Sequence, residues 1–390
     1  QQQPSLGGAA MLGAPSISRW MTHTLRHPVR TVLMLSLVLG AGLSASAGPA
    51  IQGNPPVPGN PGADPLPSWV EGSSKRAVLR FVQQASGEAD GSRAAVPPAE
   101  RIAVFDNDGT LWSEQPLYVP FLFCIDRIRQ LAPTHPLWRH QEPYASALRG
   151  DVAALLRQGP TALSTLLVSG TAGLSTDAYR EEVKRWIRTA RHPQTGRPYT
   201  AMVYQPMLEL LRFLRARGFR TWIVSGGEVE FMRAWSESVY GIPPEQVIGT
   251  RVELAYRDAP DGPILERLPA IEALVDGPGK AVAIEQIIGR RPLAAFGNSD
   301  GDRQMLRWTM AGPGPRFALL VHHTDARREW AYDRRSPVGR LDQALDQASR
   351  DGWTVVDMAR DWRVIHPRWP APAQAPEAPQ PDYSSAAGSR

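Results

Sequence analysis

Four short apolar runs recur along the chain, each followed by glycine or polar residues: 102–105, 221–224, 293–296 and 317–321. Runs that are apolar at every position are typical of strands buried on both faces, as in parallel sheets. The segments 206–217 and 281–288 lie between these runs and have the character of helices. Strands that alternate with helices predict an α/β fold with a doubly wound, mostly parallel sheet.

Three other segments extend this pattern. Residues 69–85 have apolar positions at helical spacing, and 247–256 with 264–265 indicate a hairpin around the turn at Asp261-Gly262. The long insertion between the first two runs contains helical stretches such as 175–190 and is too long for a loop. We therefore predict an α/β core formed by 68–116 and 205–367, with a helical cap at 117–204.

The two ends of the chain differ from this body. Residues 1–20 have no assigned role, whereas 21–47 read as a signal peptide: a basic start, the apolar run 31–43, then Ala-Ser-Ala. That run falls short of the ~20 residues a membrane-spanning helix needs. Residues 48–67 form a Pro/Gly-rich linker and 368–390 a disordered tail. We expect an exported protein, periplasmic or secreted, without a stable membrane anchor.

Composition adds little to this picture. The net charge of +5 comes from arginines scattered along the chain, without the basic stripe of a nucleic-acid-binding module, so we expect no nucleic-acid partner. The single cysteine, Cys124, lies in an apolar run and is interpreted as a core residue. The chain has only three lysines, which draws attention to Lys280.

The residues that follow the apolar runs define a candidate site. They are Asp-Asn-Asp-Gly-Thr at 106–110, Ser-Gly-Gly at 225–227 and Gly-Asn-Ser-Asp-Gly-Asp at 297–302, with Lys280 at the start of a predicted helix. Ligands of doubly wound sheets bind beyond the carboxyl ends of the strands, so we expect these residues to meet in one cleft.

Phosphoryl transfer to a carboxylate accounts for this set of residues. The reaction needs a nucleophile, an acid for the leaving oxygen and positive charge around the transferring group. Asp106 and Asp108 both reach the cleft, and Gly109 permits a tight turn that aims backbone N–H groups at phosphate. Two carboxylates this close repel each other unless a cation lies between them, and Mg²⁺ suits oxygen ligands.

These residues resemble the four motifs of the haloacid dehalogenase-like hydrolase superfamily, over about residues 69–367. Val-Ser-Gly-Gly at 224–227, with an insertion after the first motif, is most similar to the phosphoserine-phosphatase-like branch. A calcium loop is the alternative for the first motif, but Leu111 and Leu117 stand where that loop needs glycine and glutamate. The resemblance implies a Rossmann-like core that carries a helical cap.

The resemblance also implies a function, that of a magnesium-dependent phosphatase acting on a small phosphorylated metabolite through an aspartyl-phosphate on Asp106. Asp108 would protonate the leaving alkoxide and then activate water. Ser225 would hydrogen-bond the phosphoryl oxygens, and Lys280 would neutralise the developing charge and hold Asp106. The expected substrate-binding residues are Gly109, Thr110, Ser225, Gly226 and Lys280.

The fourth motif departs from the family pattern. Asn298 stands where an aspartate ligand is usual and Gly301 where an asparagine is usual, whereas Asp302 keeps its place. Asp300 is therefore a candidate to take over metal ligation. The implied Mg²⁺ ligands are Asp106, the backbone carbonyl of Asp108, and one or more of Asn298, Asp300 and Asp302.

Neighbouring residues extend the candidate site. Trp112, Glu114 and Tyr118 follow the first motif and are candidates to line the pocket, with packing at the hinge as the alternative for Trp112. His322 and His323 follow the fourth apolar run, where we favour a loop pair over a substrate contact.

Two other functions compete with the phosphatase. A haloacid dehalogenase shares the attacking aspartate, but such enzymes do without the second aspartate and the metal, so Asp108 counts against it. From a different class, a catalytically silent protein could bind a phosphorylated ligand in the same cleft. Binding alone needs no nucleophile, so Asp106, Asp108 and Lys280 together favour an enzyme.

Overall fold

The computed structural model describes residues 63–88 and 95–369. The expected signal peptide at 21–47, the extension 1–20, most of the predicted linker and nearly all of the predicted tail lie outside the described residues. Among the helices in the described ranges, none combines the length and the apolar character needed to cross a bilayer.

One sheet forms the centre of the described chain, with the strand order β4-β3-β2-β1-β5-β6-β7. The strands are β1 (Ile102–Phe105), β2 (Arg220–Glu228), β3 (Val247–Arg257), β4 (Ile264–Ala273), β5 (Ala294–Gly297), β6 (Phe317–His322) and β7 (Thr354–Asp357). Neighbouring strands pair in parallel except β3 and β4, which are antiparallel. The predicted α/β fold with a mostly parallel sheet is confirmed.

Helices cover both faces of the sheet because alternate residues of its strands point to opposite sides. Ala103 and Phe105 of β1 pack in one apolar cluster with α1 (Ser73–Ser86) and α7 (Gln205–Ala216). Ile102 and Val104 pack in a second cluster, whose helices are α10 (Pro278–Ile288), α11 (Arg303–Met310) and α12 (Gln343–Asp351). The fully apolar runs of the sequence are thus strands buried between two helical layers.

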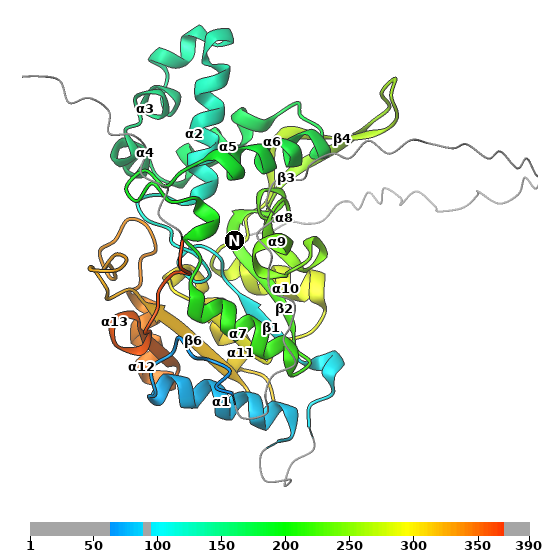
Figure 1. Cartoon of the computed structure of the whole chain (residues 1–390). Coiled ribbons are helices and arrows are strands. Elements are labelled where there is room, and N and C mark those ends of the chain that lie inside the picture. Colours follow the sequence, from blue (N-terminus) through cyan, green and yellow to red (C-terminus); the bar gives the residue numbers. More distant parts are fainter. Residues whose placement is uncertain (1–62, 89–94, 370–390) are drawn as a thin grey trace, which may run out of the picture. The chain divides into compact units, whose positions relative to one another are not determined.

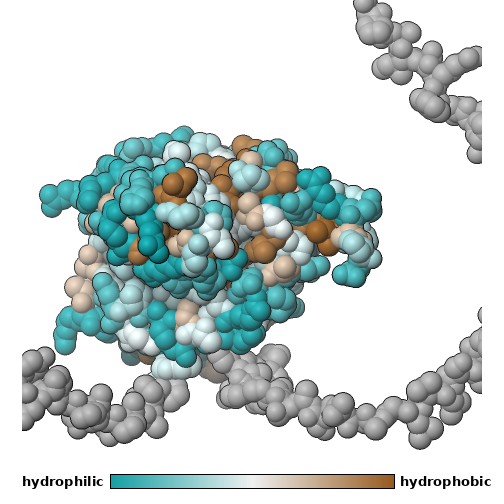
Figure 2. All heavy atoms as spheres, turned by 90° about the horizontal axis from the view of Figure 1, so that it is seen from above, coloured by the Kyte–Doolittle hydropathy of each residue, from teal (hydrophilic) through white to brown (hydrophobic). Residues whose placement is uncertain are grey.

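A group of helices fills the long insertion after β1: α2 (Val119–Leu131), α3 (Tyr144–Arg149), α4 (Val152–Gln158), α5 (Pro160–Thr171) and α6 (Thr176–Thr189). Figure 1 shows them gathered together, with β3 and β4 reaching in beside α5 and α6. Tyr179, Val183 and Ile187 of α6 are buried at spacings of four residues, so one face of this helix is apolar. Seen from above, the surface is mostly hydrophilic with several apolar patches (Figure 2). That these helices close over the site as a cap stays a prediction.

Short elements complete the described chain. They are α8 (Val229–Arg233), α9 (Ser236–Tyr240), α13 (Met358–Asp361), η1 (Pro98–Glu100), η2 (Ala132–Thr134), η3 (Pro136–His140), η4 (Tyr199–Ala201), η5 (Pro244–Gln246) and η6 (Asp300–Asp302), the last six being 3₁₀ helices.

The predicted linker needs one correction. Its last residues belong to the packed body, because Leu66 is fully buried in the core beside Trp69. Asp64 also accepts a hydrogen bond from the buried Lys75 at 2.6 Å. A proline-rich composition therefore did not mark where the folded part begins.

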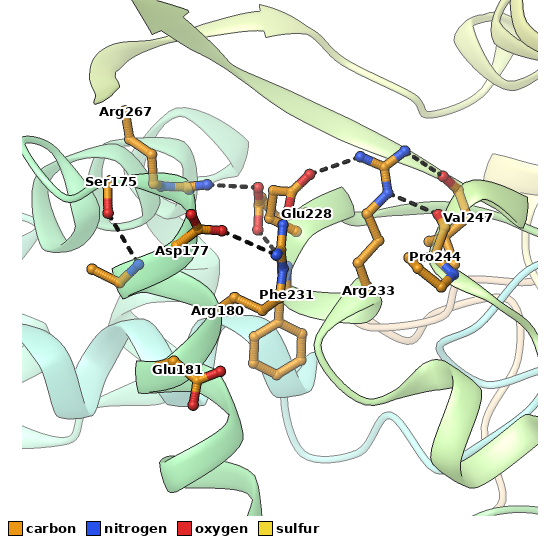
Figure 3. A network of polar contacts seen from close by, with 12 residues as sticks. Ser175, Asp177, Arg180, Glu181, Glu228, Phe231, Arg233, Pro244, Val247 and Arg267 are labelled. Carbon is orange, nitrogen blue, oxygen red and sulfur yellow. Dashed lines mark hydrogen bonds and ion pairs between the residues drawn. The ribbon is translucent and has the colours of Figure 1, made fainter. Parts of the chain in front are cut away.

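A buried ion pair ties β4 to β2 and to the helical insertion. Arg267 on β4 donates to Glu228 at the end of β2 (3.0 Å) and to the Thr171 hydroxyl of α5 (3.2 Å). Its guanidinium also lies 3.7 Å from the centre of the Tyr179 ring of α6. Figure 3 shows Arg267 and Glu228 reaching toward each other from the two sides of this junction. Both side chains are almost completely buried, so each depends on the other for neutralisation.

We expect Arg267→Met to lower the free energy of unfolding by about 3–5 kcal/mol, because it leaves Glu228 buried without its partner. The double variant Arg267→Met/Glu228→Gln should recover part of this loss. Arg251→Met breaks a more exposed pair with Glu272, between β3 and β4, and should change stability by less than about 1 kcal/mol. Urea unfolding of the four proteins measures these differences. Equal losses for Arg267→Met and Arg251→Met would contradict the role given to the buried pair.

Candidate active site

The loop after β1 is shaped by its backbone. Gly109 has a φ of +75° and donates its N–H to the carbonyl of Trp112 at 2.8 Å. A Cβ atom at this position would lie 2.1 Å from the amide nitrogen of Asn298 and 2.3 Å from Oε1 of Glu114. Only glycine fits this close approach and this left-handed conformation. The turn carries Asp106 and Asp108, both buried, to the wall of one cavity.

Lys280 joins two of the predicted site residues. Its ammonium group lies 2.7 Å from Oδ1 of Asp106 and 2.6 Å from Oδ1 of Asp302, and all three side chains are buried. Burial alone lowers the pKa of Lys280, but Asp106 and Asp302 outweigh burial and raise it. Lys280 is therefore a fixed positive charge beside Asp106.

Burial makes the aspartates of the first motif unusual acids. It raises the pKa of Asp106, assisted by the negative charge of Asp302 and opposed by Lys280. Burial also raises the pKa of Asp108 to about 6, against a 2.7 Å hydrogen bond from the Trp112 indole N–H and the charge of Lys280. A group that exchanges a proton near neutral pH is suited to general acid–base catalysis.

Ser225 and the glycines after it form the next part of the cavity wall. The Ser225 hydroxyl is buried and accepts a hydrogen bond from the Gly227 N–H at 3.0 Å. A Cβ at Gly227 would lie 3.5 Å from Oδ2 of Asp108, so this strand end adjoins the first motif. Gly226 lines the same cavity. The structure thus brings together Asp106, Asp108, Ser225, Gly226 and Lys280.

Other predicted site residues lie away from the cavity wall. Thr110 is fully buried, and its hydroxyl donates to the side-chain oxygen of Asn298 at 3.1 Å. Asp300 accepts hydrogen bonds from the backbone N–H groups of Asp342 (3.0 Å) and Ala344 (2.8 Å) where α12 begins. This placement gives no support to the prediction that Asp300 takes over metal ligation.

Both carboxylate oxygens of Asp302 accept hydrogen bonds. Oδ1 accepts from Lys280, while Oδ2 accepts from the backbone N–H groups of Asn298 (2.9 Å) and Ser299 (3.0 Å). These bonds fix the side chain of Asp302 and the loop after β5. The geometry therefore makes Asp302 a positioning residue for Lys280.

Asn298 faces a third carboxylate at the site. Its amide nitrogen donates to Oε1 of Glu114 at 2.7 Å, and the Tyr332 hydroxyl donates to the same oxygen at 2.8 Å. Burial raises the pKa of Glu114 well above its usual range, and the charges of Asp108 and Asp106 raise it further. Glu114 lines the cavity together with these aspartates, as its place after the first motif suggested.

Of the two histidines at the end of β6, His323 supports the loop after β1. His323 is buried, and its Nε2 donates to the carbonyl of Gly109 at 2.8 Å while Nδ1 faces Glu329 at 3.1 Å. His322 lies 3.4 Å from Asp333. Neither residue lines the cavity, which agrees with the interpretation of a loop pair.

The cavity holds about 290 Å³ and has two kinds of wall. The strand ends, the segment after β1 and the start of α10 supply its charged groups and the Ser225 hydroxyl. Helices α2, α4 and α5, with the segment before α2, supply a mainly apolar wall that includes Tyr118, Phe121, Leu156, Leu163 and Leu167. Among the described residues that line it, Lys280 is the only lysine or arginine.

The donor set can be compared with the needs of a hard cation. No three His, Cys, Asp or Glu side chains in the described ranges stand together as a ready-made metal site. The Asp106 carboxylate is present, however, and the carbonyl oxygen of Asp108 accepts no backbone hydrogen bond within the described part. One carboxylate and one free carbonyl at a carboxylate-rich cavity suit Mg²⁺, which takes oxygen ligands and keeps several waters.

Sequence reasoning missed Asp276, which lies between β4 and α10 and lines the cavity. An added Cβ at Gly301 would lie 2.5 Å from Oδ1 of Asp276, so the glycine in the fourth motif leaves room for this side chain. In the sequence, the only sign of this arrangement was Gly301, which stands where the family usually has asparagine. It could not point to Asp276, because the contact joins loops from different strands.

The doubly wound sheet, with carboxylates and one lysine gathered at its strand ends, defines an α/β protein whose site lies at the carboxyl edge of the sheet. The family model of haloacid dehalogenase-like hydrolases matches residues 103–307, more than half of the chain, and the protein belongs to this family. The resemblance of the motifs to this family is thereby confirmed. No curated protein matches the sequence.

Several solved structures are similar to this one. A protein of unknown function from Bordetella pertussis Tohama I has 18% identity over 66% of this chain and 99% of its own, with a TM-score of 0.43. A phosphoserine phosphohydrolase-like protein from Francisella tularensis has 16% identity over 64% of this chain and 98% of its own, with a TM-score of 0.33. A probable phosphoserine phosphatase from Vibrio cholerae has 15% identity over 58% of this chain and 57% of its own, with a TM-score of 0.32. Similarities this distant carry no conclusion about substrate.

Proposed function

We propose that this hydrolase is a magnesium-dependent phosphatase that cleaves a phosphomonoester through an aspartyl-phosphate on Asp106. The observation that carries the proposal is the contact of Lys280 with Asp106 and Asp302 at a cavity that also contains Asp108 and Ser225. A carboxylate nucleophile, a fixed cation, a proton-exchanging acid and a hydroxyl are the groups that phosphoryl transfer to a carboxylate requires.

The first step forms a bond between a carboxylate oxygen of Asp106 and phosphorus while the bond from phosphorus to the leaving oxygen breaks. Lys280 binds Oδ1, and no hydrogen bond to Oδ2 of Asp106 is found among the described residues, so Oδ2 is free to attack. Asp108 gives its proton to the leaving oxygen. The Ser225 hydroxyl and the charge of Lys280 stabilise the negative charge on the phosphoryl oxygens.

The second step returns the enzyme to its starting state. Water attacks phosphorus of the aspartyl-phosphate, Asp108 takes the proton of that water, and inorganic phosphate leaves with the Asp106 carboxylate restored. Trp112 holds Asp108 in place throughout. Mg²⁺, when held by Asp106 and the backbone carbonyl of Asp108, would reduce the repulsion between the carboxylates and the phosphate dianion.

The cavity also supports a proposal about the leaving group. Its helical wall is apolar, and its one lysine is already engaged by two carboxylates. A leaving group that carries a carboxylate or a second phosphate would find no free lysine or arginine among the described lining residues, and Asp276 would repel it. We therefore propose a substrate whose alcohol or phenol part is uncharged or cationic and largely apolar.

Phosphate release with and without Mg²⁺ tests this function. We expect hydrolysis of p-nitrophenyl phosphate that stops after chelation and returns with added Mg²⁺, and faster hydrolysis of aryl and alkyl phosphates than of phosphoserine or sugar bisphosphates. Full activity after exhaustive chelation would favour the dehalogenase-type chemistry. Binding of phosphate esters without any turnover would favour the silent binding protein.

A further inference from the structure

Among the described residues, no lysine or arginine contacts the buried carboxylate of Glu114. It is 1% exposed, and its two donors, Asn298 and Tyr332, are both neutral and both bond to Oε1. No hydrogen bond to Oε2 is found among the described residues. Burying a carboxylate is costly unless a cation compensates it.

A purely structural role does not account for this charge. A glutamine at this position would accept the same two hydrogen bonds through its amide oxygen, at no cost of burying a charge. Lys280, the only lysine or arginine among the described residues that line the cavity, is already shared by Asp106 and Asp302. Among the described residues, neither Glu114 nor Asp108 forms a hydrogen bond or ion pair with this ammonium group.

Two glycines leave the space that the Glu114 carboxylate occupies. A Cβ at Gly339 would lie 1.8 Å from Oε1 of Glu114, and a Cβ at Gly109 would lie 2.3 Å from the same atom. Two glycines in left-handed conformations therefore make room for this carboxylate from opposite loops. Glu114 lines the same cavity as Asp106 and Asp108.

We propose that Glu114 supplies a carboxylate ligand of the divalent cation, with Asn298 as the residue that orients it. This inference rests on the metal dependence proposed above and adds to it the residue that completes the donor set. Asp106, the carbonyl of Asp108 and Glu114 then offer three oxygen donors from one loop. The amide group of Asn298 fixes Glu114 from the loop after β5, at the position where the sequence lacks the expected aspartate.

Calorimetric titration with MgCl₂ tests this assignment, with Mn²⁺ binding followed by electron paramagnetic resonance as a second readout. We expect Glu114→Gln, which keeps both hydrogen bonds, to weaken Mg²⁺ binding by at least about 10-fold. Asp276→Asn removes the same charge at the exposed rim of the same cavity and should change the affinity by less than about 3-fold. The double variant Glu114→Gln/Asn298→Asp exchanges the carboxylate and the amide of this pair, whose side chains are 2.7 Å apart in the wild type. It should regain most of the Mg²⁺ affinity that Glu114→Gln loses.

Circular dichroism and thermal unfolding of each variant without metal show whether the fold is kept. An unchanged Mg²⁺ affinity in folded Glu114→Gln, while the wild type binds, would overturn the assignment and leave the proposed function standing. An equal loss in Asp276→Asn would overturn it as well, because general charge and not ligation would then explain the effect. A wild-type protein that binds neither Mg²⁺ nor Mn²⁺ would overturn the proposed metal dependence itself.

Discussion

Asp106→Asn is expected to abolish phosphomonoester hydrolysis and to leave the fold intact. We expect kcat to fall on the order of 10⁴-fold or more, because the amide keeps the shape of the side chain but cannot form the aspartyl-phosphate. The amide oxygen can still accept the hydrogen bond from Lys280, so the packing around β1 should persist. Steady-state kinetics with p-nitrophenyl phosphate, together with circular dichroism, measure both parts of the prediction.

Asp177→Asn is the matched control for this variant. Asp177 pairs with Arg180 on α6, and its side chain is 87% exposed. The same chemical change should there leave kcat within about 2-fold of wild type, since surface substitutions have small effects. Substantial turnover by purified Asp106→Asn would rule out Asp106 as the nucleophile.

Lys280→Met is expected to have the second largest effect. Removal of the ammonium group leaves Asp106 and Asp302 buried without the cation that both contact, and the phosphoryl group loses its fixed positive charge. We expect kcat to fall by on the order of 10²–10³-fold and the free energy of unfolding to fall by about 3–5 kcal/mol. Kinetics and urea unfolding of the same preparation report the two losses.

Lys184→Met provides the comparison for Lys280→Met. Lys184 lies on α6, is 41% exposed and contacts Glu181 at 2.9 Å. Loss of this surface pair should cost less than about 1 kcal/mol and should not affect kcat. If Lys280→Met behaves like Lys184→Met, the contact of Lys280 with Asp106 has no catalytic role.

Much of the fold could be predicted because its strands are buried on both faces. The runs 102–105, 221–224, 293–296 and 317–321 are apolar at every position except Thr221, and each lies within a strand or overlaps one by all but a single residue. β7 was missed because Thr354–Asp357 lies at the edge of the sheet and is only partly buried, so its sequence is mixed. The hairpin was expected, but its parallel pairing with β2 depends on contacts that local pattern does not encode.

The site was predictable only as far as strand ends and motifs determine it. Asp106 and Asp108 follow β1, Ser225 lies in the last part of β2 and Lys280 lies at the start of α10, and the topology brings them to one edge of the sheet. Asp300 and Asp302 could not be told apart by residue type. The 3₁₀ turn η6 directs Asp302 to Lys280, while Asp300 meets the start of α12.

The place of Glu114 depends on loops that are far apart in the sequence. Its carboxylate is fixed by Asn298 after β5 and by Tyr332 after β6, and Gly339 leaves room for it. The sequence showed Asn298 in place of an aspartate, which marks a missing charge. Only the tertiary structure shows which carboxylate lies beside that asparagine.

Trapping of the covalent intermediate tests the central claim most directly. The enzyme is mixed with excess p-nitrophenyl phosphate and Mg²⁺, denatured with acid during turnover, digested and analysed by mass spectrometry. The account predicts one phosphoryl group on Asp106 of the wild type, lost on treatment with hydroxylamine and absent from Asp106→Asn. Release of p-nitrophenol in the first turnover with no phosphoryl group on Asp106 at any quench time would contradict it.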